Sequence, residues 1–462
     1  MDNWSSFNLL MKKAWIPLAA LPLIACFLQA ASPAVSELPL PEKVLPSLDA
    51  ILRSAVQQSP RMVNRSLLLE IADNDRTMAR ANLLPTLNAS YSYNSASDLQ
   101  QNQTARSNSI KTPYSVSLNQ PLFYWGERKN NDKMGAIQRK IAEGDYVQGY
   151  RLLAQELRSN YLRLVVQKIT VRKARFYQQY LNNQLKLQED RLLKKVISEV
   201  DIAISRQNAE QGQIALERAE LEFANSKLSF ARLAGIGSIS DEAIPDAITE
   251  TAYAPAPYDQ LLADFLSQKD PVNSTAFSLR QQIEVANLTY ANAKTRLRPK
   301  VSAVLALTQD EQSNYLGGGA RYTYSSRYAG ISINWLIFDG FAAGAASRNA
   351  LIRRRTLEND YHQLTEQLAQ DAQTAVKQIN FAARNMAIYD RLFVSNQGYL
   401  NTTREDFKRG IKSEAEVGQV QLGVFDAELN ANNARADYLL QVSAFLGTLN
   451  EDPIVANLPS KS

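Results

Sequence analysis

Residues 198–202 of the chain read SEVDI, and residues 413–417 read SEAEV, 215 positions further on. One heptad stripe of mostly apolar and small residues follows each stretch, and every member of the first stripe has its counterpart at the same offset. The two stripes are Ile202, Ser205, Ala209, Gly212, Leu216, Ala219, Phe223, Ser226 and Phe230, and Val417, Val420, Val424, Ala427, Ala431, Ala434, Tyr438, Gln441 and Phe445. A constant offset over so long a stretch indicates that the chain contains two copies of one structural unit.

Two further blocks carry the duplication toward the N-terminus. Residues 81–87, ANLLPTL, match residues 295–301, TRLRPKV, at an offset of 214. Residues 118–123, LNQPLF, match residues 333–338, INWLIF, at an offset of 215. Because three separated blocks stay in nearly one register, the sequence predicts an internal twofold repeat.

The duplication divides the chain into regions. We expect a first repeat at residues 47–235 and a second at residues 258–450, joined by a proline-containing linker at 236–257. Residues 31–46 precede the first repeat as an N-terminal extension, and residues 451–462 follow the second as a C-terminal tail.

Periodicity predicts long helices in each repeat. Apolar residues recur every three or four positions from Tyr150 to Leu164, and no proline occurs between Pro121 and Pro245. Each repeat is expected to contain a helix of about 35 residues, two strands, a helix of about 60 residues and, after a break, a second helix of about 35. A helix of about 60 residues is roughly 90 Å long, and the heptad stripe predicts that it packs against its neighbour as in a coiled coil.

Alternation of apolar and polar residues predicts the strands. It occurs at residues 87–94, 114–119, 301–307 and 331–337. One polar and one apolar face suit a strand of a membrane β-barrel, although the pattern alone also fits a soluble antiparallel sheet with one wet face. Four strands cannot close a barrel and open sheet edges are not tolerated in lipid, so we expect the chain to oligomerise.

Aromatic residues lie near the ends of these expected strands. Tyr322, Tyr324 and Tyr328 are expected near one end, and Tyr124, Trp125 and Trp335 near the other. Because Tyr and Trp are enriched at membrane–water interfaces, we predict that these six side chains contact outer-membrane lipid at the interfaces.

The N-terminus resembles an export signal at residues 1–30. Two lysines precede an apolar run at residues 14–28, which is too short to span a membrane with margin. The only cysteine, Cys26, ends the tetrapeptide LIAC, which resembles a lipobox whose thiol takes a diacylglycerol. The alternative is that Cys26 belongs to the signal core and is removed by cleavage further along. Both alternatives leave the mature monomer without a disulfide.

Composition and motifs give no indication of an enzyme, a metal, a cofactor or a nucleic-acid site. The 51 Lys and Arg residues are interleaved with 46 Asp and Glu residues, so the net charge of +5 forms no basic face. The run RRR at residues 353–355 is interpreted as a solvated helix face. His362 is the only histidine, and no phosphate-cradling loop ending in Gly-Lys-Ser/Thr occurs.

Across nearly all of the mature chain, the sequence resembles the outer-membrane efflux protein family, the TolC-like channels. The motifs are Leu48-Asp49-Ala50 before Ser59-Pro60, Leu84-Pro85-Thr86-Leu87, Phe338-Asp339-Gly340, and Phe407-Lys408-Arg409-Gly410 before the stripe that ends in Tyr438-Leu439-Leu440. Each motif is weak alone, and their order within the duplication makes the set specific.

The resemblance implies an α+β membrane protein of the outer membrane with a periplasmic helical extension. Long antiparallel helical hairpins would form an α-barrel, and four amphipathic strands per chain would contribute to the twelve-stranded β-barrel of a homotrimer. The implied function is export of solutes or polypeptides, in efflux or in type I secretion. The implied partners are a periplasmic adaptor protein and an inner-membrane RND pump or ABC exporter.

The resemblance also implies a periplasmic gate at the hairpin ends. Glu416 stands six residues after the motif glycine, as a gate acid of the family does, and Asp201 is its equivalent in the first repeat. Lys412 matches a basic gate residue, whereas Gln419 occupies a second acidic position of the family. The alternative is that Asp201 and Glu416 merely complement the dipole at the start of a helix.

A second class of protein also shows export and long helices, namely a periplasmic coiled-coil adaptor or scaffold of an export complex. Such an adaptor needs one hairpin and has no reason to duplicate amphipathic strand pairs. The sequence therefore favours the channel.

Overall fold

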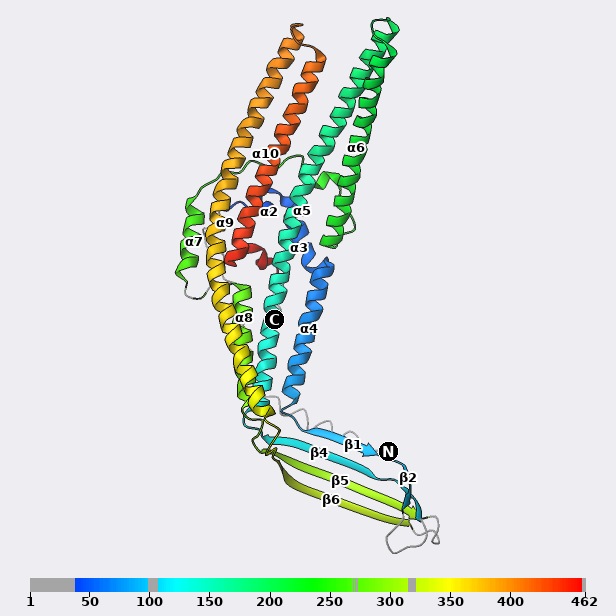
Figure 1. Cartoon of the computed structure of the whole chain (residues 1–462), viewed down its shortest axis with the longest axis vertical. Helices are drawn as coiled ribbons and strands as arrows, with labels where there is room; N and C mark the ends of the chain where they lie inside the picture. Colours follow the sequence, from blue (N-terminus) through cyan, green and yellow to red (C-terminus); the bar gives the residue numbers. More distant parts are fainter. Residues whose placement is uncertain (1–37, 99–106, 269, 271–272, 315–320, 459–462) are drawn as a thin grey trace, which may run out of the picture.

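A computed structural model describes residues 38–98, 107–268, 270, 273–314 and 321–458 (Figure 1). The expected export signal and Cys26 lie outside the described residues. The chain is elongated, with a sheet at one end and helices that run from the sheet to the opposite end (Figure 1).

Four helices make up the two hairpins. The long helices α5 (Glu127–Leu193) and α9 (Ala342–Lys408) have 67 residues each, which corresponds to about 100 Å. The return helices α6 (Glu199–Ala234) and α10 (Glu414–Leu449) have 36 residues each. Both helices of the first hairpin begin and end 215 positions before their counterparts in the second.

The heptad stripe of α6 faces α5. Its larger members are buried, among them Ile202, Leu216 and Phe230. Gly212 permits close approach, because a Cβ at this position would lie 2.8 Å from Cδ1 of Leu181 in α5. The predicted coiled-coil-like packing is therefore present. No described helix is both long enough and apolar enough to cross a membrane.

The first helix of each repeat is shorter than expected. In place of one helix of about 35 residues, the first repeat has α3 (Pro46–Gln58) and α4 (Pro60–Ala81), after the single turn α2 (Pro41–Val44). Ser59 separates α3 from α4 with an extended backbone, ψ 128°, because the following proline disfavours the helical conformation. The second repeat has α7 (Ala256–Ser267) and α8 (Ser274–Ala293), the latter capped by the side chain of Asn273.

The sheet has six strands where four were expected. The first repeat supplies β1 (Thr86–Tyr91), β2 (Asn94–Asp98), β3 (Ser107–Lys111) and β4 (Tyr114–Phe123), and the second supplies β5 (Lys300–Asn314) and β6 (Arg321–Asn334). The expected strand at residues 87–94 is broken into β1 and β2, whereas the one at residues 114–119 lies within β4 and is preceded, after a second break, by β3. Pro113 lies at one of the breaks, where its missing N–H interrupts the ladder.

The six strands form four antiparallel arms. β1 pairs with β4, β4 with β5, and β5 with β6, while β2 pairs with β3 and β3 continues alongside β5. The arms therefore run alternately toward and away from the helices (Figure 1).

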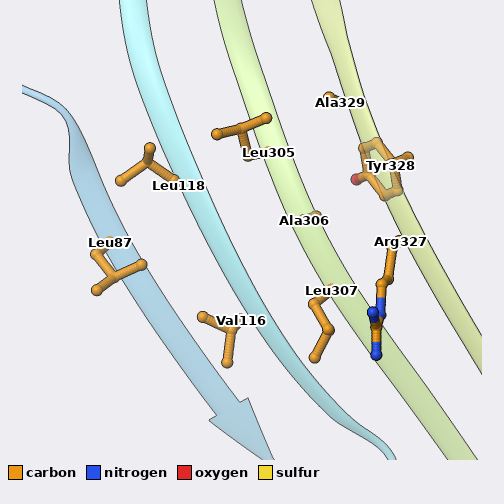
Figure 2. A pocket seen from close by; sticks show the side chains of 9 residues that line it. All are labelled: Leu87, Val116, Leu118, Leu305, Ala306, Leu307, Arg327, Tyr328 and Ala329. Carbon is orange, nitrogen blue, oxygen red and sulfur yellow. The ribbon is translucent and has the colours of Figure 1, made fainter. Parts of the chain in front are cut away.

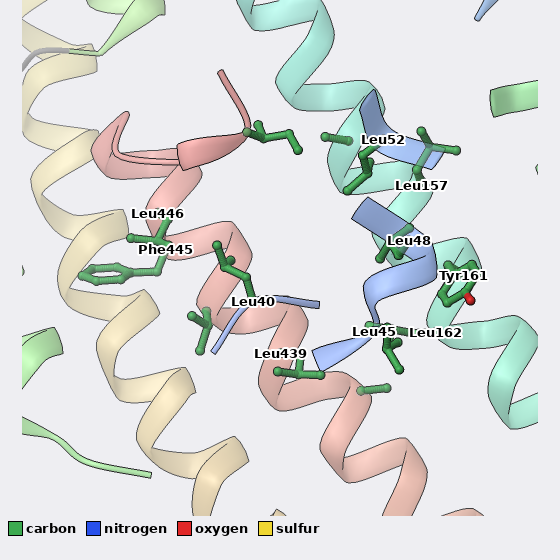
Figure 3. Close-up of a cluster of buried hydrophobic side chains, with 14 of the residues drawn as sticks. Leu40, Leu45, Leu48, Leu52, Leu157, Tyr161, Leu162, Leu439, Phe445 and Leu446 are labelled. Atoms are coloured by element: carbon green, nitrogen blue, oxygen red, sulfur yellow. The ribbon is translucent and has the colours of Figure 1, made fainter. Parts of the chain in front are cut away.

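The main hydrophobic core lies halfway along the helices, where α2 and α3 pack between α5 and α10 (Figure 3). Its labelled members are Leu40, Leu45, Leu48, Leu52, Leu157, Tyr161, Leu162, Leu439, Phe445 and Leu446. The core thus joins residues from the N-terminal extension, the first repeat and the second repeat.

Candidate functional site

The two hairpin ends are built alike. α5 ends in a pair of backbone hydrogen bonds, from Val196 N to Arg191 O at 2.9 Å and from Lys195 N to Leu192 O at 2.8 Å. α9 ends with the same pair, from Ile411 to Asp406 and from Gly410 to Phe407. This is the Schellman arrangement, in which the residue after the cap takes a left-handed conformation.

A capping box starts each return helix. The Ser198 hydroxyl accepts a hydrogen bond from Asp201 N, and the Asp201 carboxylate accepts one from Ser198 N at 3.0 Å. Ser413 and Glu416 make the same reciprocal pair, with Ser413 N donating to Glu416 Oε2 at 2.8 Å. Both predicted gate acids are therefore held at the third position of their helices, and both are exposed.

Lys412 and Gln419 complete the predicted gate residues. Lys412 Nζ contacts Glu416 Oε1 at 2.7 Å, so the two charges of the second hairpin end compensate each other. Gln419 is exposed one turn further along α10.

The pKa values of the two acids reflect these contacts. Hydrogen bonds from Lys412 and then from Ser413 lower the pKa of Glu416 to about 2. The backbone and then the side chain of Ser198 lower the pKa of Asp201 from its ordinary value. Both carboxylates are therefore ionised at neutral pH. Within the described ranges, Asp201 has no lysine partner of the kind that Glu416 has in Lys412.

The two hairpins also touch each other, which the sequence had not indicated. Near the ends, a Cβ at Gly418 of α10 would overlap the ring of Tyr180 in α5, so the two helices lie as close as a glycine allows. Phe176 and Phe425 follow, with ring centroids 5.5 Å apart. The two ion pairs Lys173–Asp426 and Arg172–Glu428 continue the contact toward the core. In the sequence, this contact corresponds only to a glycine at position 418, which by itself does not identify the neighbouring helix.

At the other end of the molecule, one face of the sheet is apolar. Register places Leu118 between Leu87 and Leu305, and Val116 beside Leu307, so these side chains share one face across three arms. Figure 2 shows these side chains on neighbouring strands, and register places Arg327 and Ala329 of β6 on the same face. The opposite face carries Asn88, Ser115, Ser117 and Thr308. The predicted two-faced strands are thus assembled into a two-faced sheet.

Three of the predicted interface aromatics lie where the sheet meets the helices. Tyr124 OH lies 3.0 Å from Ser302 Oγ. Trp125 Nε1 donates to Pro299 O at 2.7 Å, and Trp335 Nε1 donates to Leu297 O at 2.9 Å.

The other three do not all lie near the far strand end. Tyr328 pairs with Ala306 in the middle of β6, and Tyr324 pairs with Asp310 nearer the far end. The even-numbered residues of β6 share a face with Ser302 and Thr308, so register assigns both tyrosines to the polar face. Tyr322 belongs to the same even-numbered series, and its side chain is outside the described part of the structure. The expected position was wrong for Tyr328 because alternation does not reveal where a strand is centred.

A buried ion cluster, also missed in the sequence, lies in the core. Arg158 of α5 is fully buried and pairs with Glu42 of α2 and with Asp452, which caps the 3-10 helix η3 (Pro453–Asn457). Arg158 Nη1 also donates to Ser443 Oγ at 2.7 Å. Burial acts to lower the pKa of Arg158, but the charges of Asp452 and Glu42 and their hydrogen bonds raise it overall.

No metal centre is present among the described residues, where no group of three or more His, Cys, Asp or Glu side chains is placed to hold an ion. His362 lies exposed on α9. The described functional geometry therefore consists of the hairpin ends and the two-faced sheet.

Comparison with protein families gives one match that covers most of the chain. The profile of the outer membrane efflux proteins matches residues 51–236 and 277–449. The chain belongs to this family. The resemblance noted in the sequence is thereby confirmed, and the efflux protein is a transport channel of the outer membrane rather than an enzyme.

Solved structures show the same fold at low sequence identity. The outer membrane protein VceC from Vibrio cholerae matches with a TM-score of 0.65 and 14% identity, over 88% of this chain and 97% of the other. The Campylobacter jejuni CmeC outer membrane channel gives 0.63 and 14%, over 88% and 86%. The open state of the Neisseria gonorrhoeae MtrE outer membrane channel gives 0.63 and 16%, over 88% and 89%. No curated protein matches the sequence of the efflux protein.

Proposed function

We propose that three copies of the efflux protein assemble into one continuous duct, whose sheets form a twelve-stranded barrel in the outer membrane and whose helices form a tunnel through the periplasm. The observation that carries this proposal is the four-arm sheet with one apolar face, whose two outer arms are paired on one side only in the described part of the chain. A sheet of this kind needs further strands before it can lie in lipid.

The arrangement of the arms permits closure by copies of the same chain. Within the described part of the sheet, β1 pairs with β4 alone and β6 pairs with β5 alone. The four arms alternate in direction, so β1 of one copy can pair antiparallel with β6 of the next. An even number of antiparallel arms per copy closes without a parallel seam.

The helices offer a second surface for the neighbouring copy. α6 carries large apolar side chains on the side that α5 does not cover, several of them seven residues apart. They are Val200, Ile204, Ile214, Leu221 and Leu228. α9 carries a matching set, Phe381, Ile388, Leu392 and Tyr399. Apolar residues at heptad spacing favour packing against another helix, and we assign that helix to the next protomer.

The duct requires partners at its periplasmic end. We propose that a periplasmic adaptor protein joins the hairpin ends to an inner-membrane pump of the RND or ABC type, which supplies the substrate and the energy. The generic walls of such a duct suit drug efflux and type I secretion alike, and the pump selects the cargo.

We further propose that the hairpin ends form the gate of the duct. Threefold repetition would bring three copies of Asp201 and Glu416 around one axis, and a ring of carboxylates in a narrow opening attracts cations. Because Lys412 neutralises Glu416, Asp201 supplies most of the negative charge, and Gln419 adds none. The capping boxes support the alternative role as well, since each acid also fixes the start of its helix.

The assembly is tested by extracting the protein from outer membranes and comparing unheated with boiled samples by denaturing electrophoresis. A heat-sensitive trimer that conducts ions in planar bilayers supports the duct. A soluble periplasmic monomer would instead favour the adaptor class.

A further inference from the structure

An aromatic and basic cluster lies at the junction of the sheet and the helices. Trp125 stacks edge-on against Phe123 with ring centroids 4.8 Å apart, and the Arg298 guanidinium lies 4.8 Å from the centre of a Trp125 ring. Trp335 is held nearby, because it donates to the carbonyl of Leu297, the residue before Arg298. We name these residues, Phe123, Trp125, Arg298 and Trp335, the junction cluster.

The junction cluster ends the apolar face of the sheet. Phe123 pairs with Val301, which begins the apolar series of β5. Trp335 comes directly after the end of β6, whose odd-numbered residues Ile331 and Ile333 lie on the apolar face. Trp125 is 38% exposed and Trp335 59% exposed, so both rings are accessible to a molecule that covers this face.

Arg298 is the free charge of the cluster. Its neighbours in sequence are paired, Arg296 with Asp339 at 3.0 Å and Lys300 with Glu127 at 2.6 Å. Among the described residues, Arg298 makes no ion pair, and its side chain is exposed beside Trp125. A cation on an aromatic face, with no carboxylate, leaves its N–H donors available for an anion.

Comparison of the two repeats shows that the fold does not require the Arg and Trp side chains of the junction cluster. The first repeat has Leu84 where the second has Arg298, and Leu84 is 60% exposed. Gly340 corresponds to Trp125, and Gln120 corresponds to Trp335. Because the corresponding positions carry other residue types, the repeated fold does not itself require the Arg and the two Trp side chains.

We propose that the junction cluster binds the phosphate headgroup of an anionic phospholipid in the periplasmic leaflet of the outer membrane, once per protomer. This inference rests on the proposed placement of the sheet in the membrane. The acyl chains would cover the apolar face, the two tryptophans would lie at the level of the headgroups, and Arg298 would pair with the phosphate. A zwitterionic lipid fits less well, since its own ammonium group competes for the phosphate.

Tryptophan fluorescence can test the proposal. Trp4 and Trp15 lie in the expected export signal, so Trp125 and Trp335 are the tryptophans of the processed chain. The channel is expressed from the full-length sequence with the substitution Trp335→Phe, so that Trp125 is the tryptophan observed. The purified protein is placed in mixed micelles that contain either phosphatidylglycerol or phosphatidylcholine with brominated acyl chains. Quenching of Trp125 reports which lipid lies next to it. The ratio for the two lipids within one variant cancels any change in the emission of Trp125 itself.

We expect phosphatidylglycerol to be preferred by about fivefold, the effect typical of one basic residue at an anionic surface, and less so at high salt. Arg298→Leu, which installs the first-repeat residue, should bring the ratio to about one, and Arg298→Lys should retain part of the preference. Arg391→Leu, an exposed arginine far along α9, is the matched control and should leave the ratio unchanged. A ratio of one in the parent channel, or an unchanged ratio in Arg298→Leu, overturns the lipid proposal alone. No quenching by either lipid overturns the membrane placement as well.

Discussion

Lys195 occupies in the first hairpin the place that Gly410 occupies in the second. Both residues have a left-handed backbone, with φ of 58° and 77°, and both close the same pair of hydrogen bonds at the end of a 67-residue helix. The fold therefore demands this conformation at both ends, although only one copy has the residue that adopts it without strain.

The first prediction follows from this difference. Lys195→Gly should stabilise the first hairpin end by about 1 kcal/mol, the usual cost of a left-handed conformation in a residue with a side chain. Hydrogen exchange of the amides at residues 196–202 should slow by about fivefold in the purified channel. Lys194→Gly is the control, because Lys194 has φ of −80° and should gain nothing. Equal slowing of exchange in both variants would show that the added stability does not come from relief of the left-handed conformation at Lys195.

The second prediction concerns the capping boxes. Ser198→Ala and Ser413→Ala should each destabilise the start of a return helix by about 1 kcal/mol, because the hydroxyl that accepts the third amide is lost. Exchange of the first-turn amides of α6 or α10 should become faster, while the other helix serves as internal reference. If neither serine matters, the serine hydroxyls do not stabilise the starts of α6 and α10.

The third prediction separates the two gate acids by charge. Asp201→Asn should reduce cation preference in planar bilayers more than Glu416→Gln, since Lys412 already compensates Glu416. Changing both acids to alanine should reduce the preference further. Reversal potentials in a salt gradient measure the effect, and selectivity unchanged in the double variant would assign both acids to the helix starts alone.

The fourth prediction concerns pH. The pKa of Glu416 in the folded hairpin, about 2, lies below its ordinary value of 4.5. The contacts of ionised Glu416 therefore stabilise the hairpin end fully above pH 4.5, and this contribution is lost as the pH falls through about 2. Replacing Lys412 with Met removes the largest cause of the shift and should move the loss to higher pH. Exchange of the α10 first-turn amides at several pH values, corrected for the intrinsic rate, would show no such movement if Lys412 does not hold the carboxylate.

The fifth prediction concerns the contact between the hairpins. Gly418→Ala inserts a methyl group against the Tyr180 ring, and overpacking of this kind costs about 1–3 kcal/mol. We expect the hairpin ends to separate and single-channel conductance to rise. Gly423→Ala is the matched control, because a Cβ at Gly423 meets nothing within 4 Å. Adding Tyr180→Ala to Gly418→Ala should restore the parent conductance, and failure to do so would remove the steric explanation.

Sequence patterns predicted the features that depend on periodicity, namely the packing of the long helices and the two faces of the sheet. The heptad stripe from Ile202 to Phe230 placed α6 against α5, and alternation placed Leu118 and Leu305 on one face of the sheet. Breaks within a helix or a strand were harder to predict from these patterns. The Ser59–Pro60 step interrupts the first helix, so the expected helix was too long. The short strands β2 and β3 have little apolar alternation, and they were not expected as separate strands.

Contacts between distant side chains could not be predicted. The approach of Gly418 to Tyr180 depends on how the two hairpins cross, which no pattern within either hairpin determines. The left-handed turn has a sequence signal only at Gly410, because Lys195 is not a residue type that favours this conformation.

The buried Arg158 has a consequence for how the chain matures. Asp452 follows Arg158 by 294 residues, and Glu42 precedes it by 116. Until the second repeat and the C-terminal tail are delivered, Arg158 lacks its partners Ser443 and Asp452, and the donors that bind them have no protein acceptor. The middle of the molecule can therefore be completed around Arg158 only after the last part of the chain has crossed the inner membrane.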